Sequence, residues 1–381
     1  MIFLDNNSTT PIDARVQQVL EENLRDNFGN PHSNYHNYGV KAKNTVSVAR
    51  GTIAEFFDVE SEGVIFNSGA TEANNQFIIG AALKAKREGS KRRKIFCSAV
   101  EHKCVLNSAE YTKSLGFEVF EIPVDQRGSV DIEWLKENID EETLLVSVMA
   151  VNNETGYSSP LKEIGEIAVS VGAYFHSDFA QGLLKKWPTL YELNLDAISI
   201  SGHKINGPKG VGALICTFNP SDTLDPIIHG GLQEGSLRSG TVPVFLVAAL
   251  GKCIEIVKNE RQAIFQHIKK LKERLQEKLI SDCPGIKLNN SEASGHPGTL
   301  NLFFPNLEAD LLCANLADKV AVSSAAACNG ISNEYSYVLK KMDYSDERAK
   351  NSLRLCIGKE NSIEDIDAAA KNILSTYYYL V

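Results

Sequence analysis

Short apolar runs alternate with segments of helical periodicity over the central part of the chain. Runs that are typical of buried strands lie at residues 63–66, 94–97, 143–150 and 195–200. The intervening segments 70–86 and 161–171 carry apolar residues three and four apart, which predicts helices. A first helix is expected from residue 11 or 12 to Asn27, before Gly29 and Pro31. Strands that alternate with helices from about residue 60 to 215 predict an α/β fold with a mostly parallel sheet flanked by helices.

The pattern changes after Pro243. A long helical pattern with Lys and Glu on its polar face extends to about Ile280. Strand-like runs then follow at 299–304, 320–323 and 353–357, and a closing helix is expected from Ser362. We therefore expect a large domain of residues 13–258 and a smaller α+β domain of residues 1–12 and 259–381, with the boundary inside the long helix.

Composition narrows the class of protein. The chain has 381 residues, of which 43% are hydrophobic, so it is long enough to bury the core of two domains. It contains no apolar stretch long enough to span a membrane, and its start lacks the basic and apolar regions of a signal peptide. The formal net charge is −9, so we expect no direct binding of nucleic acid. Segment 84–94 is basic and is interpreted as a solvated helix end, with docking of an acidic partner as the alternative.

The eight cysteines are scattered along the chain without a CxxC pair or a Cys/His cluster. This distribution indicates reduced thiols in the cytoplasm, and it predicts neither a disulfide framework nor a metal site. Most of these residues are expected to be small core residues, and the full set is Cys97, Cys104, Cys216, Cys253, Cys283, Cys313, Cys328 and Cys356.

Two polar residues follow predicted strands and suggest chemistry. Lys204 lies in SGHK, where a strand gives way to a Gly-rich turn, so its amine can project from the carboxyl edge of the sheet and form a Schiff base with a carbonyl cofactor. Asp178 ends an apolar strand, and a buried carboxylate there needs a cationic partner such as a protonated pyridine nitrogen. Taken singly, Lys204 is better interpreted as a solvated turn lysine, and Asp178 as half of a structural ion pair.

Two further segments also follow strands. Ser68 to Ala73 opens a helix, whose backbone N–H groups and the Thr71 hydroxyl favour a phosphate; a plain helix cap is the alternative. His102 follows another strand, where an imidazole could lie over an aromatic cofactor and exchange protons, or be a structural histidine.

Taken together, these motifs resemble those of the fold-type I pyridoxal-phosphate enzymes, and among them the NifS/IscS-type cysteine desulfurases. The resemblance runs nearly end to end, and the set is far more specific than any one member. Its segments are LDNNSTTP at 4–11, GNPHS at 29–33, SGATEAN at 68–74, EH at 101–102, VNNETG at 151–156, DFAQ at 178–181, SGHK at 201–204, QE at 233–234, RSGT at 238–241, SSAAAC at 323–328 and SLR at 352–354.

The resemblance implies a pyridoxal 5'-phosphate cofactor and a role for each matching residue. Lys204 would bind the cofactor covalently, Asp178 would pair with its ring nitrogen, Gln181 would contact the ring oxygen, and His102 would stack on the ring and act in catalysis. The phosphate would be held by Ala70, Thr71, Ser201 and His203, and by Thr241 from the second subunit of a homodimer. Asn153, which also contacts the cofactor, and Arg354 would bind the carboxylate of the substrate.

Cys328 distinguishes between the subclasses. It lies in a run of small residues without periodicity, which predicts a loop, and the resemblance makes it the nucleophile that takes sulfur from L-cysteine as a persulfide and releases L-alanine. A small buried cysteine is the plain alternative. Two other functions remain open, namely a selenocysteine lyase or other class V aminotransferase-like enzyme, and a non-catalytic scaffold of a sulfur-transfer complex.

The resemblance further implies a protein that accepts the sulfur, in iron–sulfur cluster assembly, DNA phosphorothioation or tRNA thiolation. Two departures bear on the pathway. Residues 325–327 are all Ala where housekeeping members usually have Gly or Ser, and the chain ends at Val381 without the tail that docks an iron–sulfur scaffold. The length is similar to that of desulfurases that serve DNA phosphorothioation.

Overall fold

The computed structural model describes residues 1–289, 295–324 and 335–381. A seven-stranded sheet forms its centre, in the order β2-β8-β7-β6-β5-β3-β4. Every strand runs parallel to the others except β8, which is antiparallel to both of its neighbours. The mostly parallel sheet is therefore confirmed. The strands are β2 (Val64–Asn67), β3 (Lys94–Ser98), β4 (Glu118–Ile122), β5 (Thr143–Ser147), β6 (Tyr174–Asp178), β7 (Ala197–Ser201) and β8 (Gly212–Cys216).

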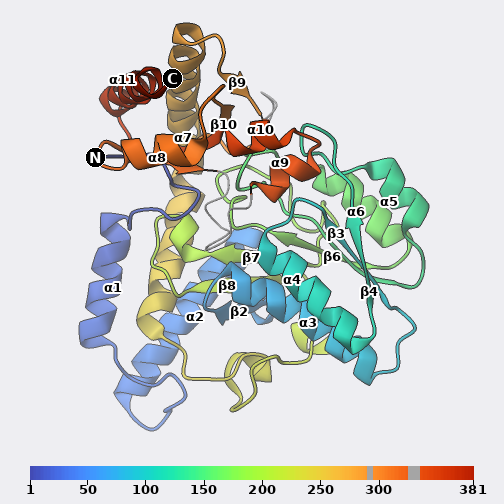
Figure 1. Ribbon diagram of the computed structural model, residues 1–381. Coiled ribbons are helices and arrows are strands. Elements are labelled where there is room, and N and C mark those ends of the chain that lie inside the picture. The colour runs from blue at the N-terminus through green and yellow to red at the C-terminus, as the bar shows by residue number, and fades with distance from the viewer. Residues whose placement is uncertain (290–294, 325–334) are drawn as a thin grey trace.

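Helices cover both faces of this sheet (Figure 1). Alternate strand residues point to opposite faces: Ile65 and Ile95 pack with one hydrophobic cluster, while Phe66 and Phe96 pack with the other. The first cluster is completed by α3 (Ala70–Arg87) and α4 (Lys103–Thr112). The second includes residues of α1 (Ala14–Asp26), α2 (Asn37–Phe57), α5 (Ile132–Asn138), α6 (Leu161–Ser170) and the first half of α7 (Val244–Asp282). The sheet is thus buried on both sides, as parallel strands require.

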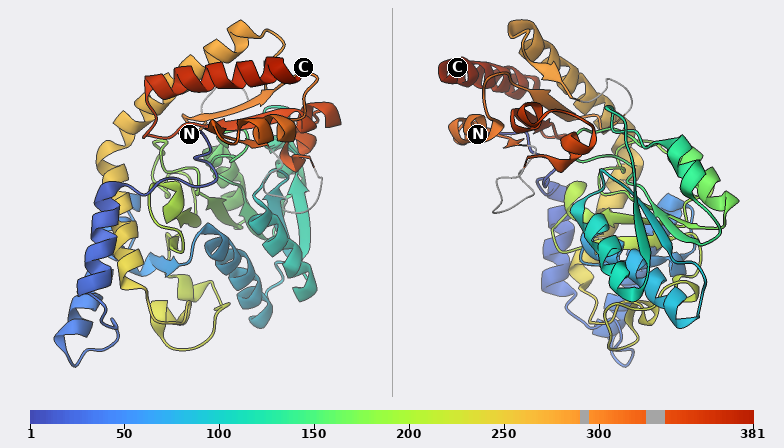
Figure 2. Two further views of the ribbon diagram at one scale, coloured as in Figure 1. Left: turned by 60° about the vertical axis from the view of Figure 1, so that its left-hand side comes forward. Right: turned by 45° about the vertical axis from the view of Figure 1, so that its right-hand side comes forward.

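A smaller unit lies beside the large one, and α7 runs unbroken from one to the other (Figures 1 and 2). It contains a four-stranded antiparallel sheet, in the order β12-β13-β10-β9. Leu271 and Leu275 of α7 belong to the hydrophobic core of this unit. Its elements are β9 (Lys287–Leu288), β10 (Thr299–Phe303), β12 (Ser323–Ser324), β13 (Ser352–Cys356), α8 (Ala309–Leu316), α9 (Tyr337–Lys341), α10 (Asp346–Lys350) and α11 (Ile363–Leu380). Since α7 is continuous, a domain boundary after residue 258 stays a prediction.

Several predicted element bounds are corrected by the structure. The first helix begins at Ala14, because the Asp13 side chain accepts a hydrogen bond from the Arg15 N–H and caps the helix there. The run 143–150 is a strand only to Ser147. The run 320–323 is divided between two sheets: β11 (Val320–Ala321) pairs with β1 (Ile2–Phe3), and β12 pairs with β13. None of the described helices combines the length and the apolar character that crossing a membrane requires.

Candidate active site

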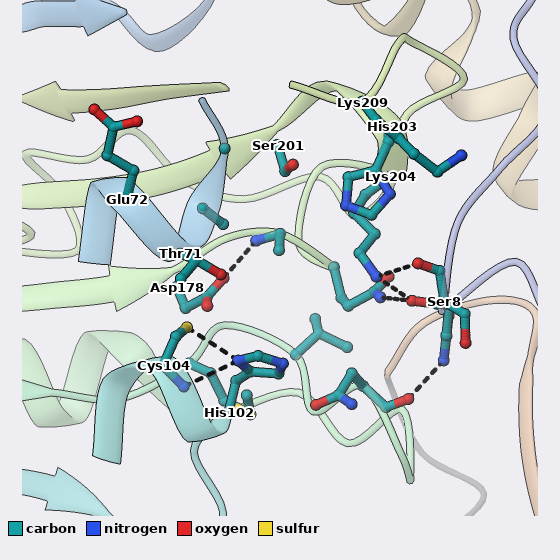
Figure 3. A pocket seen from close by; sticks show the side chains of 18 of the residues that line it. Ser8, Thr71, Glu72, His102, Cys104, Asp178, Ser201, His203, Lys204 and Lys209 are labelled. Atoms are coloured by element: carbon teal, nitrogen blue, oxygen red, sulfur yellow. Dashed lines mark hydrogen bonds between the residues drawn. The ribbon is translucent and has the colours of Figure 1, made fainter. Parts of the chain in front are cut away.

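A cavity of about 590 Å³ opens where the parallel strands of the large sheet end (Figure 3). Ligands in open α/β sheets bind at this edge. The wall contains ten of the residues singled out from the sequence: Ala70, Thr71, His102, Asn153, Asp178, Gln181, Ser201, His203, Lys204 and Arg354. The chain therefore brings together residues that are up to 284 positions apart, counted from Ala70 to Arg354.

Gly69 and the first turn of α3 form one wall of the cavity. Gly69 adopts φ +146°, and a Cβ atom there would lie 3.2 Å from the Ser201 hydroxyl oxygen, so glycine permits a close approach between the helix start and β7. The first N–H groups of α3 have no preceding helical turn to bond to, and they carry the positive end of the helix dipole. Glu72 lies in this turn, but Arg238 forms an ion pair with it at 2.9 Å. The wall is thus suited to an anion such as a phosphate.

Asp178 ends β6 and is only 5% exposed. One carboxylate oxygen accepts a hydrogen bond from the backbone N–H of Ala180 at 2.8 Å, and the other accepts one from the Asn74 amide at 2.7 Å. These donors orient the carboxylate. It is therefore prepared to interact with a cation in the cavity.

Lys204 ends a short 3-10 turn, Gly202–Lys204, that follows β7. Its ammonium donates hydrogen bonds to the carbonyl oxygens of Asn7 and Ser8, the latter at 2.9 Å (Figure 3). The amide of Gln181 donates to the same Asn7 oxygen at 2.9 Å. The N-terminal segment thus holds the lysine beside the cavity.

His102 caps the start of α4, and its Nδ1 accepts a hydrogen bond from the backbone N–H of Cys104 at 3.2 Å. Burial lowers the pKa of His102; Asp178 opposes the effect, while Lys204 and Lys103 reinforce it. His203 behaves similarly, since burial together with Lys204 and Lys209 lowers its pKa to about 4. Both imidazoles are therefore neutral near pH 7.

Arg354 lies on β13, and its side chain is 3% exposed. One guanidinium nitrogen donates to the Asp5 carboxylate at 2.9 Å and to the Ser8 hydroxyl at 2.6 Å. The other terminal nitrogen lies 3.4 Å from the carbonyl oxygen of Asn153. A planar guanidinium held in this way at a cavity wall is suited to binding a carboxylate.

The described cavity does not test the roles of two of the predicted residues. Thr241 is exposed and is not among the residues that line this cavity, so its contact with a second subunit's phosphate stays a prediction. Cys328 lies outside the described residues.

Asn74, Cys104 and Glu154 lie at or next to the site and were given no role from the sequence. Asn74 lies one helical turn after Ala70 on the same face of α3, and this spacing was the available signal. Cys104 lines the cavity two residues after His102. Glu154 follows Asn153, is 3% exposed, and accepts a hydrogen bond from the Ser336 hydroxyl. Burial raises the pKa of Glu154 to about 7 despite that bond and the charges of Arg354 and Lys103.

Comparison with known proteins agrees with this geometry. The family described as aminotransferase class-V matches residues 2–369. A protein named "Cysteine desulfurase IscS" from Rickettsia typhi (strain ATCC VR-144 / Wilmington) is 42% identical over 374 residues, which cover 98% of this chain and 90% of that protein.

Solved structures give the same result. One titled as a NifS-like protein superposes with a TM-score of 0.91 at 31% identity and covers 99% of both chains. Another, titled "SspA in complex with cysteine", has a TM-score of 0.83 at 31% identity and covers 95% of this chain and 100% of that one. With its sheet, its cavity and this match over nearly its whole length, the chain belongs to the aminotransferase class-V family.

Proposed function

We propose that this protein is a pyridoxal-phosphate-dependent cysteine desulfurase, which converts L-cysteine to L-alanine and takes the sulfur as a persulfide on Cys328. The observation that carries the proposal is the convergence of Lys204, Asp178 and Arg354 on one cavity in a chain 42% identical to a cysteine desulfurase. These groups supply an amine, an anion and a carboxylate receptor.

The described residues fit the cofactor. Gly69 and the start of α3 offer a cradle for its phosphate, with Ala70, Thr71, Ser201 and His203 around it. Asp178 would pair with the ring nitrogen, Gln181 would lie near the ring oxygen, and Lys204 would hold the aldehyde carbon. When bound, the cofactor supplies an electron sink that makes the bonds around the substrate's α-carbon labile.

The protein's own residues would then orient the substrate and move protons. Arg354 would bind the carboxylate of cysteine, with Asn153 beside it, and this contact fixes which bonds face Lys204 and His102. Lys204 would act as the base that takes the proton from the α-carbon. His102 is neutral near pH 7, so it would exchange protons with the substrate as a neutral imidazole.

Cys328 would perform the sulfur transfer. Its thiolate attacks the substrate sulfur, the new S–S bond forms as the Cβ–S bond breaks, and the carbon keeps the bonding pair and takes a proton. The products are alanine and a Cys328 persulfide, and no external oxidant is needed.

Replacement of Cys328 tests this assignment. The Cys328→Ala variant is expected to bind the cofactor, seen as visible absorbance that borohydride bleaches, and to release no sulfide from cysteine under reducing conditions. Cys283→Ala is the matched control, because this cysteine follows α7 and is not among the residues that line the cavity. Normal turnover of Cys328→Ala would refute the role of the thiol.

The same assays separate the other candidates. A non-catalytic scaffold would show neither the visible absorbance nor alanine formation. A selenocysteine lyase would turn over selenocysteine far faster than cysteine, and an aminotransferase would require a keto acid as the second substrate.

We further propose a cytoplasmic homodimer in which Thr241 completes the phosphate site of the partner subunit. All seven described cysteines are free, which suits a reducing compartment. Size-exclusion chromatography with light scattering tests the dimer, and loss of cofactor affinity in Thr241→Ala tests the shared site.

The sulfur acceptor is proposed to be a protein of an iron–sulfur, DNA phosphorothioation or tRNA thiolation system. The basic segment 84–94 is a weak candidate for its docking site, because some of its basic side chains form ion pairs within the chain. Arg87 forms an ion pair with Asp225 at 2.8 Å, and Lys94 forms one with Glu142 at 3.1 Å. The enzyme can be loaded with a persulfide that carries labelled sulfur and then mixed with candidate proteins. The protein that receives the label is the acceptor.

A further inference from the structure

A chain of hydrogen bonds leads from Asp178 to His102 through two residues that have no assigned role. Asn74 donates to Asp178 at 2.7 Å and to the Cys104 sulfur at 3.1 Å. The Cys104 sulfur lies 3.0 Å from Nδ1 of His102. Figure 3 shows the last contact, with the sulfur and the imidazole side by side in the cavity wall below Asp178. The chain thus joins the proposed partner of the cofactor's ring nitrogen to the proposed acid–base group.

The direction of the first bonds follows from the donor inventory. An ionised carboxylate only accepts hydrogen bonds, so the group of Asn74 that faces Asp178 is its NH2 group. Asn74 is fully buried, with an exposure of 0%. Its second amide hydrogen is available to the Cys104 sulfur, which is a weak acceptor.

Cys104 is a protonated thiol in this position. Burial raises the pKa of Cys104 to about 12, and the charge of Asp178 adds to the effect, while hydrogen bonds with Asn74 and Thr71 oppose it. Near pH 7 the sulfur therefore keeps its hydrogen and can donate it to His102 while it accepts from Asn74.

The contacts of His102 identify which of its nitrogens is the acceptor. The backbone N–H of Cys104 donates to Nδ1, so Nδ1 carries a lone pair, and the Cys104 sulfur lies 3.0 Å from the same atom. The neutral imidazole then has its proton on Nε2. Hydrogen bonds donated to Nδ1 disfavour the protonation of this nitrogen and so lower the pKa of His102. Burial and the nearby charges of Lys204 and Lys103 lower this pKa as well.

We propose that Cys104 is a positioning residue of this site, whose thiol links Asn74 and Asp178 to His102 and holds the imidazole with its proton on Nε2. This inference rests on the proposed function, because it concerns the proton carrier of that reaction. Cys104 acts through His102, while Cys328 is the residue that takes the sulfur.

Nitrogen-15 NMR of the His102 ring tests the proposal in the full-length protein loaded with pyridoxal phosphate. The His102→Gln variant identifies the signal. In the wild type the neutral ring is expected to carry its proton on Nε2. In Cys104→Ala the His102 titration is expected to move up by about 0.5 to 1 pH unit, the effect of one ordinary hydrogen bond lost from the neutral form.

A conservative variant and a matched control separate this role from plain packing. Cys104→Ser keeps a donor and an acceptor at the same atom, so it is expected to retain the wild-type tautomer and to titrate closer to the wild type than Cys104→Ala. Cys216→Ala, the same change in a buried strand outside the cavity, is expected to leave the His102 titration unchanged. The low-pH limb of the rate profile should move with the titration in Cys104→Ala.

Three results would overturn the proposal: a wild-type His102 with its neutral proton on Nδ1, a Cys104→Ala variant that titrates as the wild type does, or a Cys104→Ser variant that matches Cys104→Ala. The wild-type tautomer is read without any Cys104 variant, so an unstable Cys104→Ala protein does not remove the test. The NMR readings also need no turnover. A protein that shows them but forms no alanine from cysteine contradicts the proposed function alone.

Discussion

The buried carboxyl of Glu154 should make the stability of the protein depend on pH. In the folded protein its pKa is about 7, against the ordinary value of 4.5, and burial is the main cause. The folded chain therefore holds the Glu154 proton more tightly than the unfolded chain does. The stabilisation from this proton is complete below pH 4.5 and is lost as the pH rises through about 7.

The two pKa values give the size of the effect. At 1.36 kcal/mol per pKa unit, about 2.5 kcal/mol of unfolding free energy should be lost between about pH 5 and about pH 8.5. Glu154→Gln has no titrating proton and keeps an acceptor for the Ser336 hydroxyl, which in turn accepts a hydrogen bond from the Leu339 N–H and caps α9. Relative to this variant, the wild type should become less stable by about 2.5 kcal/mol over that range.

Urea unfolding followed by circular dichroism measures the difference at a series of pH values, with protein and cofactor concentrations held fixed. Other titrating groups, such as Asp196, whose pKa is raised to about 6 by burial, are common to both proteins and cancel. Glu163→Gln is the matched control, because Glu163 lies exposed in the first turn of α6. A difference between wild type and Glu154→Gln that stays constant from about pH 5 to about pH 8.5 would refute the reasoning.

Three further changes have expected outcomes. Arg354→Lys should raise the KM for cysteine about tenfold, since lysine lacks the planar fork that binds both carboxylate oxygens; an unchanged KM in steady-state alanine assays would contradict the carboxylate contact. Asp178→Asn should retain cofactor binding but lower kcat by about 10²-fold or more, because a neutral amide does not keep the ring nitrogen charged; single-turnover spectra with kcat near wild type would argue against that pairing. Phe77→Ala should lower the free energy of unfolding by about 3 to 5 kcal/mol, since this fully buried ring stacks on the His176 ring with 5.1 Å between the centroids. A loss below about 1 kcal/mol in urea titrations would show that neighbouring side chains fill the space left by the ring.

The sequence predicted the parts of the fold that depend on local pattern. The helix 161–171 and the strand 94–97 were placed to within one residue, because their periodicity is strong and their ends carry clear signals. The antiparallel direction of β8 was not predictable, since a strand buried on both faces has the same pattern in either direction. The division of residues 320–323 depends on two partner strands, β1 and β13, at opposite ends of the chain.

The candidate site was likewise predictable from the sequence only in part. Lys204, Asp178 and His102 follow strands of a parallel sheet, so their meeting at one edge follows from topology. The contacts of Cys104 with Asn74 could not be inferred, because the two residues lie on different helices and no local spacing relates them. The raised pKa of Glu154 could not be inferred either, because it results mainly from burial in the folded protein.

The N-terminal segment has a consequence for how the protein is made. Asp5 bonds to Arg354 across 349 positions of sequence, and the carbonyl oxygens of Asn7 and Ser8 bond to Lys204. During synthesis these first residues leave the ribosome long before β13 exists. The contact with Arg354 therefore cannot form until almost the whole chain has emerged. The catalytic pocket is therefore among the last parts of the protein to be completed, and a nascent chain that stops short of β13 lacks a finished one.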